Sequence, residues 1–246
     1  MELDPGLTAL RPLGGFFVLR TGVGPAGPTA PPLDRTYAGE LTGVQTDALA
    51  DRIGVVADRL RVREPRVCAS LAQQGLAARL WSAALGCAAL YGRVPDLAPR
   101  LLRWDAAATA PDDLWLAEVR PLPGDADTLA DTVLHSHLQP LGQALTRRYG
   151  VAPGLLRGNA ASALAGAARQ LDHWARGNAR ADVAERAAAL TDSLFAHPLL
   201  SGTGARSGTR FRRRSCCLYY RVPGGGVCGD CCFTRPPGSS PRAASE

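Results

Sequence analysis

Apolar residues in the second quarter of the chain recur at the spacing of one helix face. The first such set is Leu49, Ile53, Val56 and Leu60. Thr46 or Asp47 precedes it and can cap its N-terminus. A second helix is predicted from about Arg66 to Tyr91, ending before Pro95. Both helices need an apolar partner surface.

Three more helices are predicted in the central part of the chain. The first starts at Asp127, with a kink at Pro140 because proline lacks the backbone N–H. It presents one apolar face made of Leu134, Leu138, Leu141 and Leu145. The other two cover roughly residues 154–176 and 182–195.

Short runs of branched and aromatic residues predict a small sheet. Gly15 to Arg20 forms one such run, and residues 102–105 and 114–119 form two more around an Ala/Pro/Asp turn. We therefore expect an α+β fold: a mostly helical domain with a small antiparallel sheet and a short C-terminal cysteine-rich segment.

The glycine-rich stretch Gly202 to Gly208 predicts a loop between two parts of the chain. We expect a helical α+β body at residues 1–201 and a cofactor-binding segment at residues 202–235. Residues 236–246 are rich in Pro and Ser, which predicts a disordered tail.

Composition is that of a globular protein, with 46% hydrophobic and 20% charged residues. The net charge is +6, and every basic residue is arginine. The first 20 residues lack the pattern of a secretory leader, and no apolar run is long enough to cross a bilayer. We therefore expect a cytoplasmic protein without a transmembrane segment, and peripheral association with a membrane stays open.

Five of the seven cysteines are crowded into residues 216–232. Cys216 and Cys217 are adjacent, ten residues follow, and Cys228 and Cys231 form a C-x-x-C pair. The stretch Leu218 to Val222 is predicted to run away from the first cysteine pair as a strand. The following Pro-Gly-Gly-Gly turns the chain back toward the first pair.

Three kinds of chemistry fit clustered cysteines. Structural zinc usually takes two C-x-x-C pairs, whereas an adjacent pair is accommodated more readily by the two irons of a 2Fe–2S cluster. A disulfide or a redox thiol pair is the third alternative, and a reducing cytoplasm and the number of thiols disfavour it. The spacing favours the cluster over zinc.

The stretch from Arg213 to Cys231 resembles the C-terminal motif of FhuF-type ferric-siderophore reductases, which carry C-C-x(10)-C-x-x-C. The resemblance implies a 2Fe–2S cluster on Cys216, Cys217, Cys228 and Cys231. Cys232 departs from the pattern and is the alternative to Cys231. More weakly, residues 155–164 resemble a helical segment of the same family.

The resemblance implies one-electron reduction of a ferric siderophore, with release of ferrous iron and a donor such as a ferredoxin or flavodoxin. No catalytic residue beyond the cluster is implied. Two alternatives remain: a non-enzymatic 2Fe–2S carrier or sensor, and a zinc-stabilised siderophore-binding module.

Arginines surround the motif. We expect Arg212, Arg213, Arg214 and Arg221 to favour the reduced cluster and to steer an acidic donor or an anionic chelate; a solvated basic linker explains them equally well. No nucleic-acid partner is expected, because Tyr219 and Tyr220 do not interleave with the arginines as a stacking platform requires.

Other polar residues have ordinary structural explanations. His135 and His137 are two apart on a helix, so we expect surface or capping histidines rather than a metal pair. Asn159 is expected to be a buried, hydrogen-bonded polar group, and the alternative is a side chain that points into a substrate pocket. Cys68 and Cys87 are expected to be inert core residues.

Overall fold

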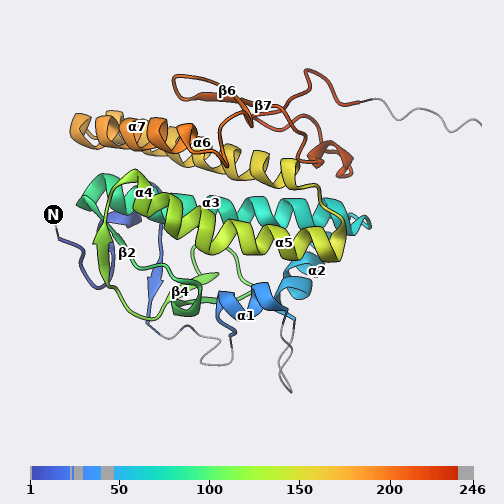
Figure 1. Ribbon diagram of the computed structural model, residues 1–246, viewed down its shortest axis with the longest axis horizontal. Coiled ribbons are helices and arrows are strands. Elements are labelled where there is room, and N and C mark those ends of the chain that lie inside the picture. The colour runs from blue at the N-terminus through green and yellow to red at the C-terminus, as the bar shows by residue number, and fades with distance from the viewer. Residues whose placement is uncertain (1, 23, 25–29, 40–46, 238–246) are drawn as a thin grey trace, which may run out of the picture.

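The computed structural model describes residues 2–22, 24, 30–39 and 47–237. Its long helices run side by side in layers, with α3 in the middle and α6 and α7 along one side of it (Figure 1). Two small sheets and the short helices lie on the other side. The helices are α1 (Leu33–Ala38), α2 (Ala48–Leu60), α3 (Pro65–Tyr91), α4 (Ala126–Leu129), α5 (Gln139–Tyr149), α6 (Pro153–Gly177) and α7 (Ala181–Ala196). Short 3-10 turns cover Thr8–Leu13, Pro99–Leu101 and Tyr219–Arg221.

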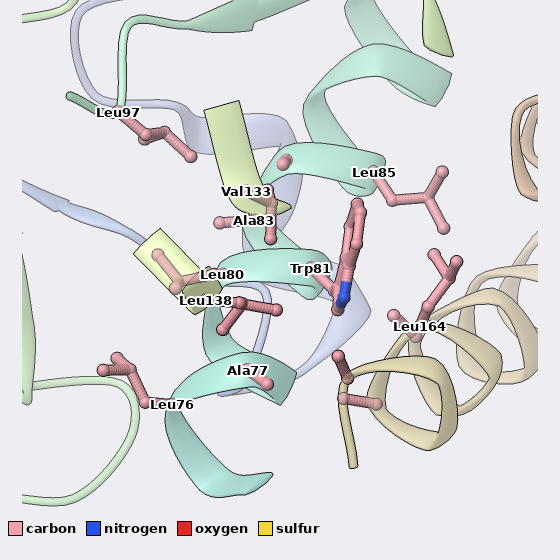
Figure 2. Close-up of a cluster of buried hydrophobic side chains, with 14 of the residues drawn as sticks. Leu76, Ala77, Leu80, Trp81, Ala83, Leu85, Leu97, Val133, Leu138 and Leu164 are labelled. Carbon is pink, nitrogen blue, oxygen red and sulfur yellow. The ribbon is translucent and has the colours of Figure 1, made fainter. Parts of the chain in front are cut away.

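Helix α3 is the centre of the core. Its alanine-rich sequence lets α6 approach closely, and Trp81 is fully buried among leucines of α3, α6 and the segment before α5 (Figure 2). The absence of a side chain at Gly86 lets Phe17 and Leu10 pack against α3, because a Cβ there would lie only 2.8 and 2.9 Å from their side chains. The helix ends at Gly92, whose left-handed conformation suits glycine.

The helix predictions are confirmed. Asp47 caps α2 by accepting from the backbone N–H of Ala50. The helix expected from Asp127 starts one residue earlier and contains a π-helical stretch, Ala130–Leu138, directly before α5. This stretch ends two residues before Pro140, and the kink expected at the proline stays a prediction.

The strands are short. β4 (Leu114–Leu116) pairs antiparallel with β3 (Leu102–Trp104) and parallel with β1 (Arg20–Thr21), and β2 (Arg93–Pro95) pairs antiparallel with β5 (Pro121–Pro123). The predicted fold class is confirmed. The two strands predicted at 102–105 and 114–119 are present in shorter form.

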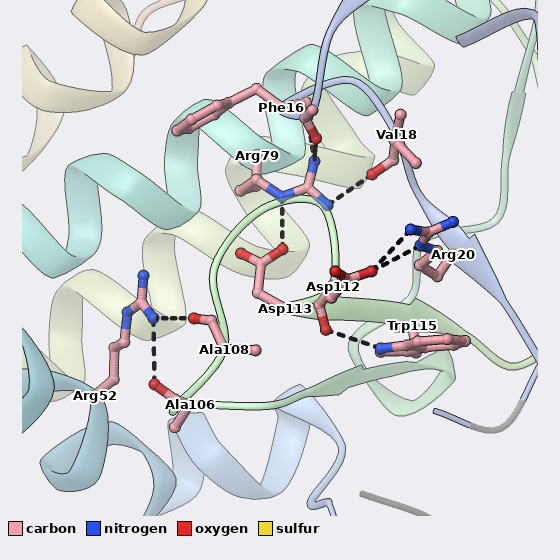
Figure 3. Close-up of polar contacts among 11 residues, drawn as sticks. Phe16, Val18, Arg20, Arg52, Arg79, Ala106, Ala108, Asp112, Asp113 and Trp115 are labelled. Atoms are coloured by element: carbon pink, nitrogen blue, oxygen red, sulfur yellow. Dashed lines mark hydrogen bonds and ion pairs between the residues drawn. The ribbon is translucent and has the colours of Figure 1, made fainter. Parts of the chain in front are cut away.

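The strand predicted for Gly15 to Arg20 is wrong except at its last residue. Arg79 of α3 explains the difference, because its guanidinium donates to the carbonyls of Gly15, Phe16 and Val18 and so takes the acceptors that a strand partner would use (Figure 3). Its Nε also donates to Asp113 at 2.8 Å, and both side chains are buried. Arg79 therefore ties residues 15–18 to α3 through their carbonyls and ties α3 to Asp113 through a buried ion pair.

His137 is fully buried, so the expectation of a surface or capping histidine is wrong for it. Its Nδ1 lies 2.8 Å from the hydroxyl of Tyr37, and its Nε2 lies 2.6 Å from the carbonyl of Leu97. Burial lowers the pKa of His137 to about 4. His135 lies beside Gln139 and His197 instead.

The glycine-rich stretch 202–208 was expected to be a loop or linker, and this is wrong for its central residues. Gly204 to Ser207 forms strand β6, which pairs antiparallel with β7 (Arg210–Arg213) around a turn at Gly208. Phe211 of β7 packs against Phe195 of α7, so the hairpin rests on the helical layer. Among the described residues, no helix is long and apolar enough to cross a membrane.

Candidate metal centre

The C-terminal segment lies on the outer side of α6, away from the sheets formed by β1 to β5 (Figure 1). Cys216 and Cys217 follow the hairpin, separated from the end of β7 by two residues. Residues 218–222 were predicted as a strand, and this is wrong: Leu218 adopts a left-handed conformation and a 3-10 turn follows at Tyr219–Arg221. The expected Pro-Gly turn is present, with the N–H of Gly225 donating to the carbonyl of Val222 at 2.7 Å.

The cysteine sulfurs are held by local backbone geometry. The N–H of Leu218 donates to Cys216 Sγ at 3.2 Å, and the N–H of Phe233 donates to Cys231 Sγ at 3.4 Å. A turn closed by the Cys231 N–H and the Cys228 carbonyl, 3.1 Å apart, shapes the C-x-x-C loop. Backbone N–H groups facing sulfur are the donors that tune iron–sulfur sites.

Cys217 and Cys228 meet across the segment. Their sulfurs lie 3.5 Å apart. Two thiolates on one tetrahedral ion, each about 2.3 Å from it, lie roughly 3.8 Å apart, whereas a disulfide requires about 2.05 Å. The separation is that of a thiol–thiol hydrogen bond, which excludes a disulfide and is also compatible with two ligands of one ion, and all seven cysteines are free thiols.

The remaining thiols are less closely gathered. Within the described ranges, no three cysteine, histidine or carboxylate side chains stand close enough to form a metal site. The full ligand set Cys216, Cys217, Cys228 and Cys231, with Cys232 as alternative, stays a prediction.

Contact with Cys228 lowers the pKa of Cys217 to about 7, and the same contact raises the pKa of Cys228. Burial raises the pKa of Cys216 and of Cys232. The positive charge of Arg213 opposes these increases at Cys216, Cys228 and Cys232 and adds to the decrease at Cys217. One arginine therefore acts on four of the thiols.

Arg213 is buried, with 2% of its surface exposed. Its Nη2 donates to the carbonyl of Leu155 at 3.4 Å and to Oδ1 of Asn159, but its Nε and Nη1 have no hydrogen-bond partner in the part of the chain that the structure describes. Leaving buried donors unpaired is costly. An anionic group bound by the thiolates would supply the missing acceptors and counter-charge, so these residues fit an all-thiolate cluster.

Asn159 connects the segment to the core. It is fully buried, and its Nδ2 donates to the carbonyl of Ser70 at 2.9 Å and to the Ser70 hydroxyl at 3.1 Å. Ser70 in turn donates to the carbonyl of Cys217 at 2.8 Å. The prediction that Asn159 is a buried and satisfied polar group is confirmed, and it supports the arginine beneath the sulfurs.

Gly158 allows the segment to lie close to α6. A Cβ at this position would collide with Ser215 Oγ and lie 3.2 Å from Arg213 Nη2. The sequence contained a signal for this contact, because Gly158 and Asn159 interrupt an otherwise alanine-rich helix.

Asp230 is a buried anchor of the segment that the sequence analysis did not single out. Its carboxylate is buried and accepts from Ser162 Oγ at 2.6 Å and from Arg169 Nη1 at 3.1 Å, while its carbonyl accepts from the N–H of Arg213. It fastens the C-x-x-C loop to α6 and β7. A carboxylate inside a two-residue loop between cysteines was the available signal.

The other predicted arginines differ from Arg213. Arg212 and Arg214 are exposed and donate to the carbonyls of Cys232 and Gly202, each at 3.1 Å, and Arg221 pairs with Glu64 at 2.6 Å. These three can meet an approaching partner, whereas Arg213 reaches only the interior of the segment.

The geometry just described coincides with a known domain. Residues 213–233 match the FhuF 2Fe-2S C-terminal domain. The resemblance of the C-terminal motif is thus confirmed over this span. No curated protein matches the chain. The FhuF match covers the hairpin's last residue, all five clustered cysteines and Asp230, and it indicates iron–sulfur binding by this segment.

Proposed function

We propose that the chain is a cytoplasmic one-electron reductase that releases iron from ferric siderophores, using a 2Fe–2S cluster held by Cys216, Cys217, Cys228 and Cys231. The observation that carries the proposal is the FhuF 2Fe-2S match at residues 213–233. It is supported by the buried guanidinium of Arg213, which has two nitrogens without a hydrogen-bond partner among the described residues and whose positive charge acts on four of the matched cysteines.

Cys231 is favoured over Cys232 as the fourth ligand. The N–H of Phe233 already points to Cys231 Sγ at 3.4 Å, and such a contact stabilises a thiolate. The Cys228–Cys231 turn also sets the x-x spacing that lets two sulfurs face one iron. Cys232 lies outside that turn, and its carbonyl is engaged by Arg212.

When bound, a cluster of this kind accepts and gives up one electron at a time. The protein's own residues provide its surroundings: Arg213 offers positive charge from the interior, and Asp230, Ser162 and Arg169 keep the loop in place. Positive charge nearby favours the reduced, more negative state.

The proposed substrate class comes from the FhuF resemblance, and the electron count is consistent with it. One electron from a donor such as a ferredoxin or flavodoxin converts a bound ferric ion to a ferrous ion, which hard oxygen ligands hold far less tightly. The exposed guanidinium groups of Arg212 and Arg214 suit an acidic donor or an anionic chelate.

The first test is chemical composition. Protein purified without oxygen is expected to contain two irons and two acid-labile sulfides per chain and to be red-brown. Stoichiometric zinc without sulfide would overturn the proposal and leave the zinc-stabilised binding module.

The second test separates a reductase from an electron carrier. The dithionite-reduced protein is mixed with a ferric hydroxamate siderophore, and reoxidation of the visible chromophore is followed together with ferrous iron captured by ferrozine. A rate well above that with ferric citrate supports the reductase. Equal rates would contradict it and favour the carrier.

A further inference from the structure

A cavity of about 350 Å³ lies on the other face of α6 from the cysteine segment. It is formed by α5, the first turns of α6, one position of α3 and the turn after α7, and α5 and α6 are neighbours in Figure 1. Its apolar lining includes Leu134, Leu138, Leu156, Ala160, Leu199 and Leu200. Cavities of this size and character are typical of sites for small organic molecules.

Two arginines give the cavity a charge. Arg147 of α5 and Arg157 of α6 line it, both are exposed, and neither has an ion-pair or hydrogen-bond partner among the described residues. Their neighbour Arg148 is different, because it pairs with Asp47. Two unpaired cations lining one apolar cavity attract an anionic ligand to it.

The floor of the cavity carries a polar side chain. Gln73 of α3 is 2% exposed, its Nε2 donates to the carbonyl of Leu156 at 3.4 Å, and its Oε1 has no partner among the described residues. An unpaired acceptor in an apolar floor favours a ligand that has a hydrogen-bond donor.

Gly142 keeps the cavity open. Glycine is among the least favourable residues inside a helix, and it lies in the second turn of α5. No close packing requires it, since a Cβ there would make only an ordinary contact, 3.6 Å from Leu156 Cδ1. A larger side chain at this position would project into the cavity.

We propose that this cavity binds a small organic anion with an apolar body and one hydrogen-bond donor. The anionic group lies between Arg147 and Arg157, and the apolar body fills the space between α5 and α6. The inference does not depend on the cluster or on the proposed reductase activity, because the cysteines are on the opposite face of α6.

The probe is 8-anilinonaphthalene-1-sulfonate, which combines a sulfonate, an anilino N–H and an aromatic body. Its fluorescence is titrated with the full-length chain carrying its native metal content. N-phenyl-1-naphthylamine has the same body and N–H without the charge, and serves as the uncharged reference. Decanoate is the competing carboxylate and decylamine its cationic counterpart.

Arg147→Gln together with Arg157→Gln is expected to weaken sulfonate binding about tenfold and to leave the uncharged probe unchanged. Gly142→Leu is expected to abolish saturable binding of both probes. Arg210→Gln, which removes an exposed arginine of β7 far from the cavity lining, and Gly142→Ala are the matched controls and should bind as the wild type does. Decanoate should displace the sulfonate, and decylamine should not.

Sulfonate binding that survives Gly142→Leu would place the probe elsewhere and overturn the proposal. If Arg210→Gln lost as much sulfonate affinity as the double arginine variant, the loss would come from the overall charge of the protein, and this would also overturn the proposal. Circular dichroism of each variant separates these outcomes from misfolding, and Gly142→Leu is expected to retain α5 because leucine is a good helix former.

Discussion

Arg79 and Arg213 are both 2% exposed, yet they have very different surroundings. Arg79 contacts the carboxylate of Asp113 and the carbonyls of Phe16 and Val18 (Figure 3), and it also donates to the carbonyl of Gly15. Arg213 donates from a single nitrogen, Nη2, to oxygens of Leu155 and Asn159. Among the described residues it has no carboxylate partner, and its other two nitrogens have no acceptor.

The difference shows how each region compensates for the charge of its buried arginine. A buried charge is tolerated only where partners compensate for its lost hydration. The helical body supplies the partners of Arg79 from its own residues. The cysteine segment supplies thiols instead, and these become counter-charges for Arg213 once a metal group deprotonates them.

The largest expected effect tests whether the segment depends on metal. Cys217→Ser should abolish the visible chromophore and the bound iron, because it removes one of the two sulfurs that already lie 3.5 Å apart. Cys232→Ser is the matched control and should keep both. If Cys232→Ser loses the iron and Cys231→Ser keeps it, Cys232 is the fourth ligand. Helix content by circular dichroism should stay unchanged in all three variants.

The body should respond to its own buried ion pair. Arg79→Met leaves Asp113 buried without its partner, so we expect a loss of about 3–5 kcal/mol in the free energy of unfolding. Arg20→Gln is the control, since the Arg20–Asp112 pair is exposed and should contribute less than about 1 kcal/mol. Guanidinium chloride unfolding of the metal-free chain measures both. A loss below about 1 kcal/mol in Arg79→Met would mean that the body is not held by this pair.

Acid should weaken the body through His137. Its pKa is about 4 in the fold because of burial, against about 6.5 in the unfolded chain, so the unfolded state binds the proton more readily between these values. Stability contributed by the neutral ring is complete above pH 6.5 and falls by about 3 kcal/mol as the pH drops to 4.

His137→Gln should remove that part of the pH dependence, whereas His135→Gln should keep it because His135 is exposed. Unfolding followed by tryptophan fluorescence from pH 4 to 7 compares the three proteins. Parallel curves for the wild type and His137→Gln would show that this histidine is not the group responsible.

The smallest expected effect is electrostatic. Arg213→Gln removes the interior charge beside the cysteines, so the reduced cluster should be disfavoured about tenfold at a fixed potential, which corresponds to 59 mV for one electron. Arg212→Gln removes an exposed charge one residue away and should change the midpoint potential much less. Redox titration followed by electron paramagnetic resonance measures both, and Arg213→Lys should restore much of the shift. Equal shifts in the two glutamine variants would remove the distinction between Arg213 and the surface arginines.

Local pattern was enough to predict the long helices and the cysteine spacing. α2, α3, α6 and α7 carry apolar positions at helical spacing along their own length, and the C-x-x-C pair is shaped by a turn that spans four residues. Both depend on neighbours in sequence, so they can be read from it. The prediction of a strand over residues 15–20 was wrong because the carbonyls of this segment accept hydrogen bonds from Arg79, which is more than 60 residues away in the sequence.

Tertiary structure alone decided which polar groups are buried and which surround the cysteines. Nothing in the sequence distinguishes Arg213 from Arg212 and Arg214, yet the alternation of β7 turns only Arg213 toward α6, where Gly158 leaves room for it. Asn159, Ser70 and Asp230 join the site from three separate segments. Burial depends on contacts between distant parts of the chain, and a residue's own neighbours in sequence do not specify them.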